Sequence, residues 1–206
     1  MSTQIEESQA RLRPADALQL LKEGNSRFRE NVRSARDLLG QVKATSGGQW
    51  PFAVILSCID SRTSSEIIFD QGIGDVFNAR IAGNILNDDI LGSMEFACRV
   101  AGARLVCVLG HSSCGAIKGA CDNVELGLLT GMLEKIQPSV DAVPVPADKA
   151  ERNSSNSDFV EAVARENVVR GMQGILERSQ VLREMVEAGE IEVVGGMYDV
   201  TTGTVE

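Results

Sequence analysis

The chain contains a single histidine, His111, and Cys114 follows it three residues later. Another cysteine, Cys58, lies just after an earlier apolar segment. Zinc prefers thiolate and imidazole ligands, and a catalytic zinc site usually has three protein ligands and one open position. With five cysteines in 206 residues, one falls at a given distance from the histidine by chance in roughly 2% of cases. The spacing therefore favours a zinc site over the alternative, a hydrogen-bonded turn histidine and buried apolar cysteines.

Asp60 and Arg62 share a short segment with Cys58 and bring further chemistry to it. An aspartate so close to a metal site can become a fourth ligand, or it can pair with a guanidinium and accept a hydrogen bond from metal-bound water. Arg62 makes the second arrangement feasible. An ordinary surface ion pair is the alternative, and it would be favoured if Cys58 were not so near.

The elements around these residues alternate between apolar and amphipathic segments. The apolar runs 52–56, 76–81, 105–109 and 191–200 have the length and β-branched content of strands. Helical patterns cover 14–30, 64–69, 88–101, 116–121, 127–140 and 158–188, and a polar, proline-rich connection covers 141–157. This alternation predicts an α/β fold: a mainly parallel central sheet of four to five strands, flanked by helices.

Parallel sheets bind ligands at the carboxyl ends of their strands. Cys58 follows the first predicted strand and His111 the third, so we expect both segments at one edge of the sheet. We predict one domain over 1–206, with an N-terminal helical arm at 1–48 and an α/β core at 49–206. The arm carries an apolar stripe that should pack on this core or on a partner subunit, formed by Leu18, Leu21, Phe28 and Val32.

The composition excludes several classes of function. Twenty Lys and Arg against 29 Asp and Glu give a formal charge of -9 and no segregated basic patch, so no nucleic-acid partner is expected. No apolar run reaches the length of a membrane span, so no membrane association is expected. Five cysteines, an odd number, favour metal ligation or a reducing compartment over a disulfide framework, which indicates a cytoplasmic protein. A periplasmic or organellar location stays open if a signal segment has been removed.

Two motifs together resemble the signature of the β-class carbonic anhydrases. They are Cys58-x-Asp60-Ser61-Arg62 and His111-x-x-Cys114-Gly115, and the resemblance extends over 52–121, including the 74–77 and 80–84 segments. The resemblance implies reversible hydration of carbon dioxide to bicarbonate and a proton at a zinc ion. It also implies that Asp60, oriented by Arg62, accepts a hydrogen bond from zinc-bound hydroxide, or swings onto zinc in a closed state.

The same resemblance implies a small substrate pocket like that of the plant-like branch. By their spacing from the motifs, Gln49, Phe77 and Phe96 match pocket-lining positions, and Gln49 with the Gly115 backbone would hold bicarbonate oxygens. Phe96 departs from the tyrosine sometimes found at its position. Core packing is the alternative for both phenylalanines. With the apolar stripe of the arm, the resemblance further implies a homodimer or homotetramer.

Two other functions fit the same residues. The fold and metal set could hydrolyse carbonyl sulfide or carbon disulfide, with access to the pocket deciding between substrates. The chain could also be a non-catalytic module in which zinc is structural and Asp60 is a permanent fourth ligand, or in which the thiols sense redox state.

Overall fold

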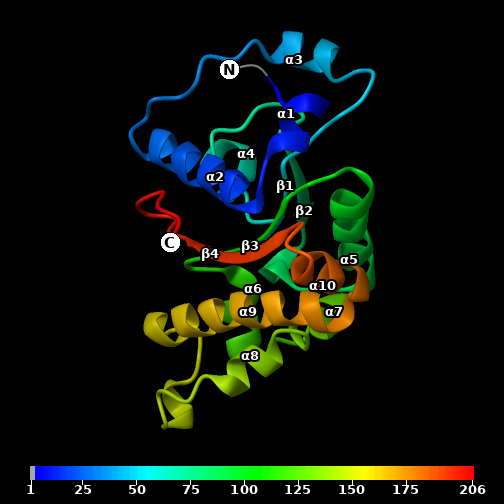
Figure 1. The fold of residues 1–206 in the computed structure, drawn as a ribbon. Coiled ribbons are helices and arrows are strands. Elements are labelled where there is room, and N and C mark those ends of the chain that lie inside the picture. The colour runs from blue at the N-terminus through cyan, green and yellow to red at the C-terminus, as the bar shows by residue number, and fades with distance from the viewer. Residues whose placement is uncertain (1–2) are drawn as a thin grey trace.

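A parallel four-stranded sheet forms the centre of the computed structural model, which describes residues 3–206 (Figure 1). The strands are β1 (Ala53–Ser57), β2 (Val76–Arg80), β3 (Leu105–His111) and β4 (Glu192–Tyr198), and their order across the sheet is β2-β1-β3-β4. All three strand pairings are parallel. The predicted α/β fold with a mainly parallel sheet is therefore confirmed. The first two residues of the predicted arm lie outside the described residues.

The two central strands are apolar because helices cover both of their faces. Every residue of β1 and β3 is buried, and side chains alternate between two hydrophobic clusters along each strand. In β1, Ala53 and Ile55 belong to one cluster, whereas Val54 and Leu56 belong to the other. This double burial explains why these strands appear in the sequence as nearly unbroken apolar runs.

Helices that precede β2 in the chain lie on one side of the sheet, and helices that follow β2 lie on the other (Figure 1). The first group is α1 (Glu6–Arg11), α2 (Pro14–Arg29), α3 (Leu38–Ala44) and α4 (Ser65–Ile68). The second group is α5 (Asp88–Glu95), a π-helical turn (Phe96–Val100), α6 (Gly115–Cys121), α7 (Gly127–Leu133), α8 (Gln137–Ala142), α9 (Ser157–Arg178) and α10 (Gln180–Glu187). Short 3-10 turns lie at Ala82–Asn84 and Lys149–Glu151. No helix in residues 3–206 is long and apolar enough to cross a membrane.

Two predicted helices are each divided in the structure. The 127–140 segment forms α7 and α8, with Pro138 in the first turn of α8, where its missing N–H costs nothing. The 158–188 segment breaks at Ser179, which has extended backbone angles. The Ser179 hydroxyl accepts a hydrogen bond from the Leu182 N–H and donates one to Glu95. A serine that caps a following helix in this way competes with helix continuation.

The N-terminal arm packs on the sheet of its own chain. Leu21 is fully buried, and Leu18 and Phe28 are partly buried against the same cluster as Ile55. Val32 does not join this stripe, since it lies beyond the end of α2 with 61% of its surface exposed. The apolar stripe of α2 is thus largely covered by the core rather than by a partner subunit.

A buried carboxylate, Asp70, ties the arm to the core. It accepts hydrogen bonds from Arg27 Nε at 2.6 Å and from the Ser34 hydroxyl at 2.9 Å, and it pairs with Arg36. Although burial by itself would raise the pKa of Asp70, the hydrogen bonds from Arg36, Arg27 and Ser34 hold it well below the usual range. Asp70 also has a φ of 44°, in the left-handed region that asparagine tolerates as well as aspartate does.

The substitution Asp70→Asn should therefore remove charge without disturbing the backbone. We expect it to lower the free energy of unfolding at pH 7 by about 3 kcal/mol, since it leaves two arginines without their buried partner. A lowered folded-state pKa stabilises above the unfolded pKa, so the difference from wild type should shrink as the pH falls below about 4. Urea unfolding at pH 7 and at lower pH measures both effects.

Asp88→Asn provides the matched control, because Asp88 pairs with Arg178 while its own side chain is 98% exposed. We expect this control to cost less than about 1 kcal/mol. Equal losses in the two variants would contradict the role assigned to Asp70.

Candidate metal centre

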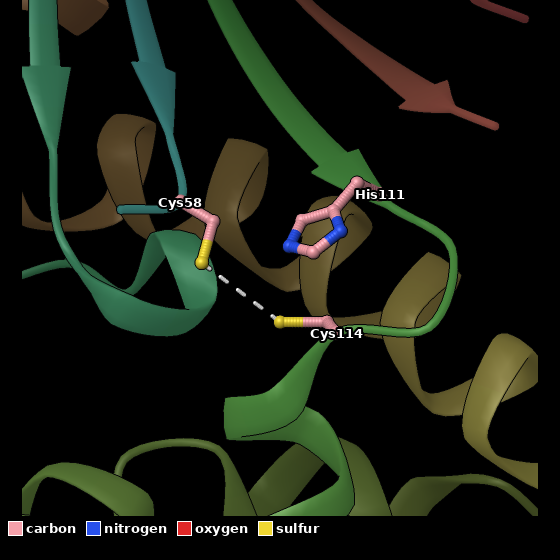
Figure 2. A group of neighbouring side chains, drawn as sticks. All are labelled: Cys58, His111 and Cys114. Carbon is pink, nitrogen blue, oxygen red and sulfur yellow. Dashed lines mark hydrogen bonds between the residues drawn. The ribbon is translucent and has the colours of Figure 1, made fainter. Parts of the chain in front are cut away.

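Cys58, His111 and Cys114 converge at the carboxyl edge of the sheet (Figure 2). Cys58 follows β1, His111 is the last residue of β3, and Cys114 immediately precedes α6. One ligand atom from each side chain lies within 4.8 Å of the other two, and all three residues are buried. The two sulfur atoms are 4.0 Å apart. Two thiolates on one tetrahedral zinc ion would be about 3.8 Å apart, so the observed spacing fits a shared metal.

A hydrogen bond made by one ring nitrogen of His111 leaves the other ring nitrogen available to bind a metal. Nδ1 lies 3.0 Å from the Ser112 carbonyl oxygen, which can only accept a hydrogen bond, so Nδ1 carries the proton. Nε2 then has a free lone pair. It is buried without a hydrogen-bond partner among the described residues and points toward the two cysteines (Figure 2). A buried polar atom with no partner is costly, and a metal ion at this point would satisfy it.

The two thiols are electrostatically coupled. The hydrogen bond from the Cys114 thiol lowers the pKa of Cys58, and the hydrogen bond from the Gly83 N–H acts in the same direction. The same shared hydrogen bond, together with burial, raises the pKa of Cys114. The proton of Cys114 is therefore harder to remove than the proton of Cys58. A divalent ion would displace that proton, because metal-bound cysteines are thiolates.

The tight turn that contains Gly83 contacts the side chain of Cys58. The Gly83 N–H donates to Cys58 Sγ at 3.3 Å, and Asn167 Nδ2 on α9 donates to the Gly83 carbonyl at 2.9 Å. Gly83 has a φ of 68°, and a Cβ there would lie 2.7 Å from Ile136 Cδ1. Only glycine fits this position. Sequence reasoning quoted the turn as part of a motif but did not assign these contacts.

Asp60 and Arg62 form a fork-shaped pair beside the cluster. Asp60 Oδ1 accepts from the Arg62 backbone N–H and from Nε, both at 2.9 Å, and Oδ2 accepts from a terminal guanidinium nitrogen at 2.7 Å. These bonds to Arg62 hold the pKa of Asp60 well below its usual range despite partial burial. Asp60 lies outside the Cys-His-Cys cluster.

Arg80 and Thr63 fix the backbone of the same segment, and sequence reasoning gave neither a role. Arg80 Nε donates to the Cys58 carbonyl at 3.0 Å, and a terminal nitrogen donates to the Asp60 carbonyl at 2.7 Å. The Thr63 hydroxyl lies 3.1 Å and 2.9 Å from the same two carbonyl oxygens. Arg80 is the last residue of β2, which pairs directly with β1. Its contact with the segment after β1 can be inferred only once the strand order is known.

The predicted pocket residues do not all gather at the metal cluster. Gly115 does, as the first residue of α6 next to Cys114. Phe77 and Phe96 contact each other edge to face, with ring centres 6.2 Å apart, but Phe77 pairs with Val54 in the sheet. Because a strand rises about 3.3 Å per residue, Val54 lies roughly 13 Å along the chain from Cys58. Gln49 precedes β1 and is exposed at the amino edge of the sheet.

Known proteins resemble this chain over nearly its whole length. The family model described as "Carbonic anhydrase" matches residues 53–205. A carbonic anhydrase of Mycolicibacterium smegmatis is 35% identical over 94% of this chain and 92% of its own length. A β-carbonic anhydrase structure from Aspergillus fumigatus matches 93% of this chain and 88% of its own, with 26% identity and a TM-score of 0.68. A carbon disulfide hydrolase structure shares the fold at 21% identity and a TM-score of 0.51, covering 80% of this chain and 82% of its own.

The cluster predicts a metal site in which each of the two thiolates is needed for tight metal binding. We expect Cys58→Ser and Cys114→Ser each to reduce bound metal by at least about tenfold, since a neutral hydroxyl replaces a thiolate in the set. Metal content per chain, measured after dialysis at fixed free zinc, tests this. Cys121→Ala is the control, because Cys121 is buried in the core and lies outside the cluster. Equal metal content in all variants would rule out the cluster as the site.

Proposed function

The chain belongs to the β-class carbonic anhydrase family, and we propose that Cys58, His111 and Cys114 hold the zinc ion of its active site. It catalyses the reversible hydration of carbon dioxide to bicarbonate and a proton. The observation that carries the metal assignment is the buried, unpartnered Nε2 of His111, which faces two thiols 4.0 Å apart. Two sulfurs and one imidazole nitrogen suit zinc better than magnesium or calcium, which prefer oxygen ligands.

Bound zinc would supply a Lewis acid that lowers the pKa of water to about 7 and so provides a nucleophile at neutral pH. The residues of the chain orient that chemistry. We propose that Asp60 accepts the hydrogen bond of the attacking water, while Arg62 keeps the carboxylate ionised and off the metal. Asp60 could become a fourth ligand only by giving up its hydrogen bonds to Arg62, so the open arrangement is the resting one we propose.

The Gly115 backbone N–H is suited to hold an oxygen of bicarbonate. It lies at the first position of α6, where backbone N–H groups have no partner within the helix. Gly115 sits next to Cys114 in the chain, and a Cβ at this position would meet no atom within 4 Å. Space for a small ligand is therefore available beside it.

The apolar part of the pocket must come from elsewhere. Phe77 and Phe96 would suit carbon dioxide, which is apolar, but they and Gln49 lie away from Cys58 in the same chain. Phe96 is 51% exposed and contacts Phe77, a residue of the edge strand β2. We therefore propose a homodimer, or a homotetramer built from it, in which this edge of one protomer lines the metal site of its partner.

Two alternatives are weaker. Hydrolysis of carbonyl sulfide or carbon disulfide would use the same metal set, but the family match and the more similar relative favour carbon dioxide. A purely structural zinc site would close its fourth position with Asp60, whereas Arg62 engages that carboxylate through three hydrogen bonds.

For location we propose the cytoplasm, because Cys58 and Cys114 lie close enough to be oxidised and must stay reduced to hold a metal.

Asp60→Asn tests the catalytic proposal. Asparagine keeps the shape of the side chain but loses the charge that Arg62 engages, so we expect kcat/KM for carbon dioxide hydration to fall by about 10- to 100-fold with zinc content unchanged. Stopped-flow hydration assays measure it, with carbonyl sulfide and carbon disulfide assayed in parallel. Glu66→Gln, an exposed carboxylate-to-amide change on α4, should retain wild-type rates. Full activity in Asp60→Asn would remove Asp60 from the mechanism.

Phe96→Asp tests the proposed assembly. A charge at the edge-to-face pair with Phe77 should weaken association across this edge, because burying an unpaired carboxylate is costly. Light scattering after size exclusion should give a dimer or a larger species for wild type and a smaller mass for the variant. Leu128→Asp, at a side chain that is 97% exposed on α7, should leave the mass unchanged. An unaltered mass in Phe96→Asp would place the interface elsewhere.

A further inference from the structure

A cavity of about 360 Å³ opens beside the Gly83–Asn84 turn, between that turn, the start of α8 and one side of α9. None of the three proposed metal ligands lines it. Its lining includes the polar or charged residues Asn84, Asp88, Lys135, Asn167, Arg170 and Arg178. Its volume is within the usual range for small-molecule sites. It is therefore a candidate binding site separate from the metal cluster.

Positive charge gathers around this cavity although the chain as a whole carries a formal charge of -9. Lys135, Arg170 and Arg178 line it against one lining acid, Asp88. Lys135 makes no ion pair among the described residues. Arg178 pairs with Asp88, whose side chain is 98% exposed, and such exposed pairs are weak. A local excess of cations in an acidic protein attracts anions.

Arg170 keeps most of its hydrogen-bonding capacity. Its Nε donates to Glu166 at 2.9 Å, one turn away on α9, and its two terminal nitrogens have no partner in the described part of the chain. A guanidinium with both terminal nitrogens free is suited to a bidentate contact with a carboxylate or a phosphate.

The inner wall of the cavity contains an unsatisfied donor. Asn84 is 3% exposed, and its side-chain nitrogen is buried with no acceptor in residues 3–206. The neighbouring polar groups satisfy one another: the Ser139 hydroxyl donates to Asn167 Oδ1 at 3.2 Å, and Asn167 Nδ2 donates to the Gly83 carbonyl. One buried amide donor is left over beside a group of cations. An oxyanion in contact with Asn84 would supply the acceptor that this donor lacks.

We propose that this cavity binds a small organic oxyanion through Asn84, Lys135 and Arg170. The oxyanion group is a carboxylate or a phosphoryl group, and Ile85, Leu86 and Pro138 provide apolar wall for the rest of the molecule. The site is joined to the metal centre by a single peptide unit, since Asn84 follows Gly83, whose N–H reaches Cys58 Sγ. A bound oxyanion that immobilises Asn84 therefore also restrains the position of Cys58. This coupling rests on the proposed metal site, whereas binding itself does not.

Calorimetric titration of the zinc-loaded protein tests binding, with inorganic phosphate and acetate as separate probes at constant ionic strength. We expect saturable binding of at least one probe, and Lys135→Glu and Arg170→Gln should each weaken it by about tenfold. Both side chains are exposed, so neither change threatens folding. Lys149→Glu makes the same charge change at an exposed lysine outside the cavity and should bind like wild type.

The probe that binds identifies the head group, phosphoryl or carboxylate. Unchanged affinity in both cavity variants would overturn the site, because binding would then occur at the metal or at another surface. Absence of saturable binding by either probe would overturn it as well.

Zinc loss to an excess of chelator tests the coupling. Saturating probe should slow the loss by about fivefold in wild type, and Lys135→Glu should need about ten times more probe for the same effect. Equal rates with and without probe in wild type would overturn the link to Cys58 while the binding site stood. Failure of the metal proposal would be recognised separately, as absence of bound zinc at the start.

Discussion

The structure around the metal centre depends on one electrostatic constraint. A buried imidazole nitrogen without a hydrogen-bond partner in the described residues faces two cysteine sulfur atoms that lie 4.0 Å apart. Neither thiol can lose its proton cheaply while the other is already a thiolate, and the nitrogen has no donor to accept from. One divalent cation resolves all of these deficits together. The arrangement is therefore that of a ligand set held ready by the fold, and zinc is the ion whose preferences match it.

Parallel sheet topology is what brings this set together. Adjacent strands β1 and β3 run in the same direction with Ser57 opposite Leu109, so the segments that leave their carboxyl ends start side by side. Helix α6 begins at once after Cys114 and returns across the sheet face. Both central strands are buried on two faces, and such a sheet resists the small displacements that would separate the ligands.

Support for the centre comes from residues far away in the chain. Asn167 on α9 holds the Gly83 turn against Cys58, and Arg80 at the end of β2 holds the Cys58 and Asp60 carbonyls. Such contacts orient ligands without touching the metal. They also mean that changes on α9, including those beside Asn84, can reach the metal ligands through one turn of backbone.

Sequence patterns by themselves determined the parallel α/β class, the strand positions and the expectation that Cys58, His111 and Cys114 share one site. They could do so because double burial produces unbroken apolar runs and because strand ends meet at one edge. The breaks at Ser179 and before Pro138 were not predicted, since helix periodicity continues through a capping serine that also donates a hydrogen bond to the distant Glu95. Only tertiary structure decided that Gly83 and Arg80 hold the Cys58 loop in place, and that Phe77 and Phe96 lie apart from the metal ligands. These outcomes depend on strand order and on contacts between segments up to 84 residues apart, which no local pattern in the chain encodes.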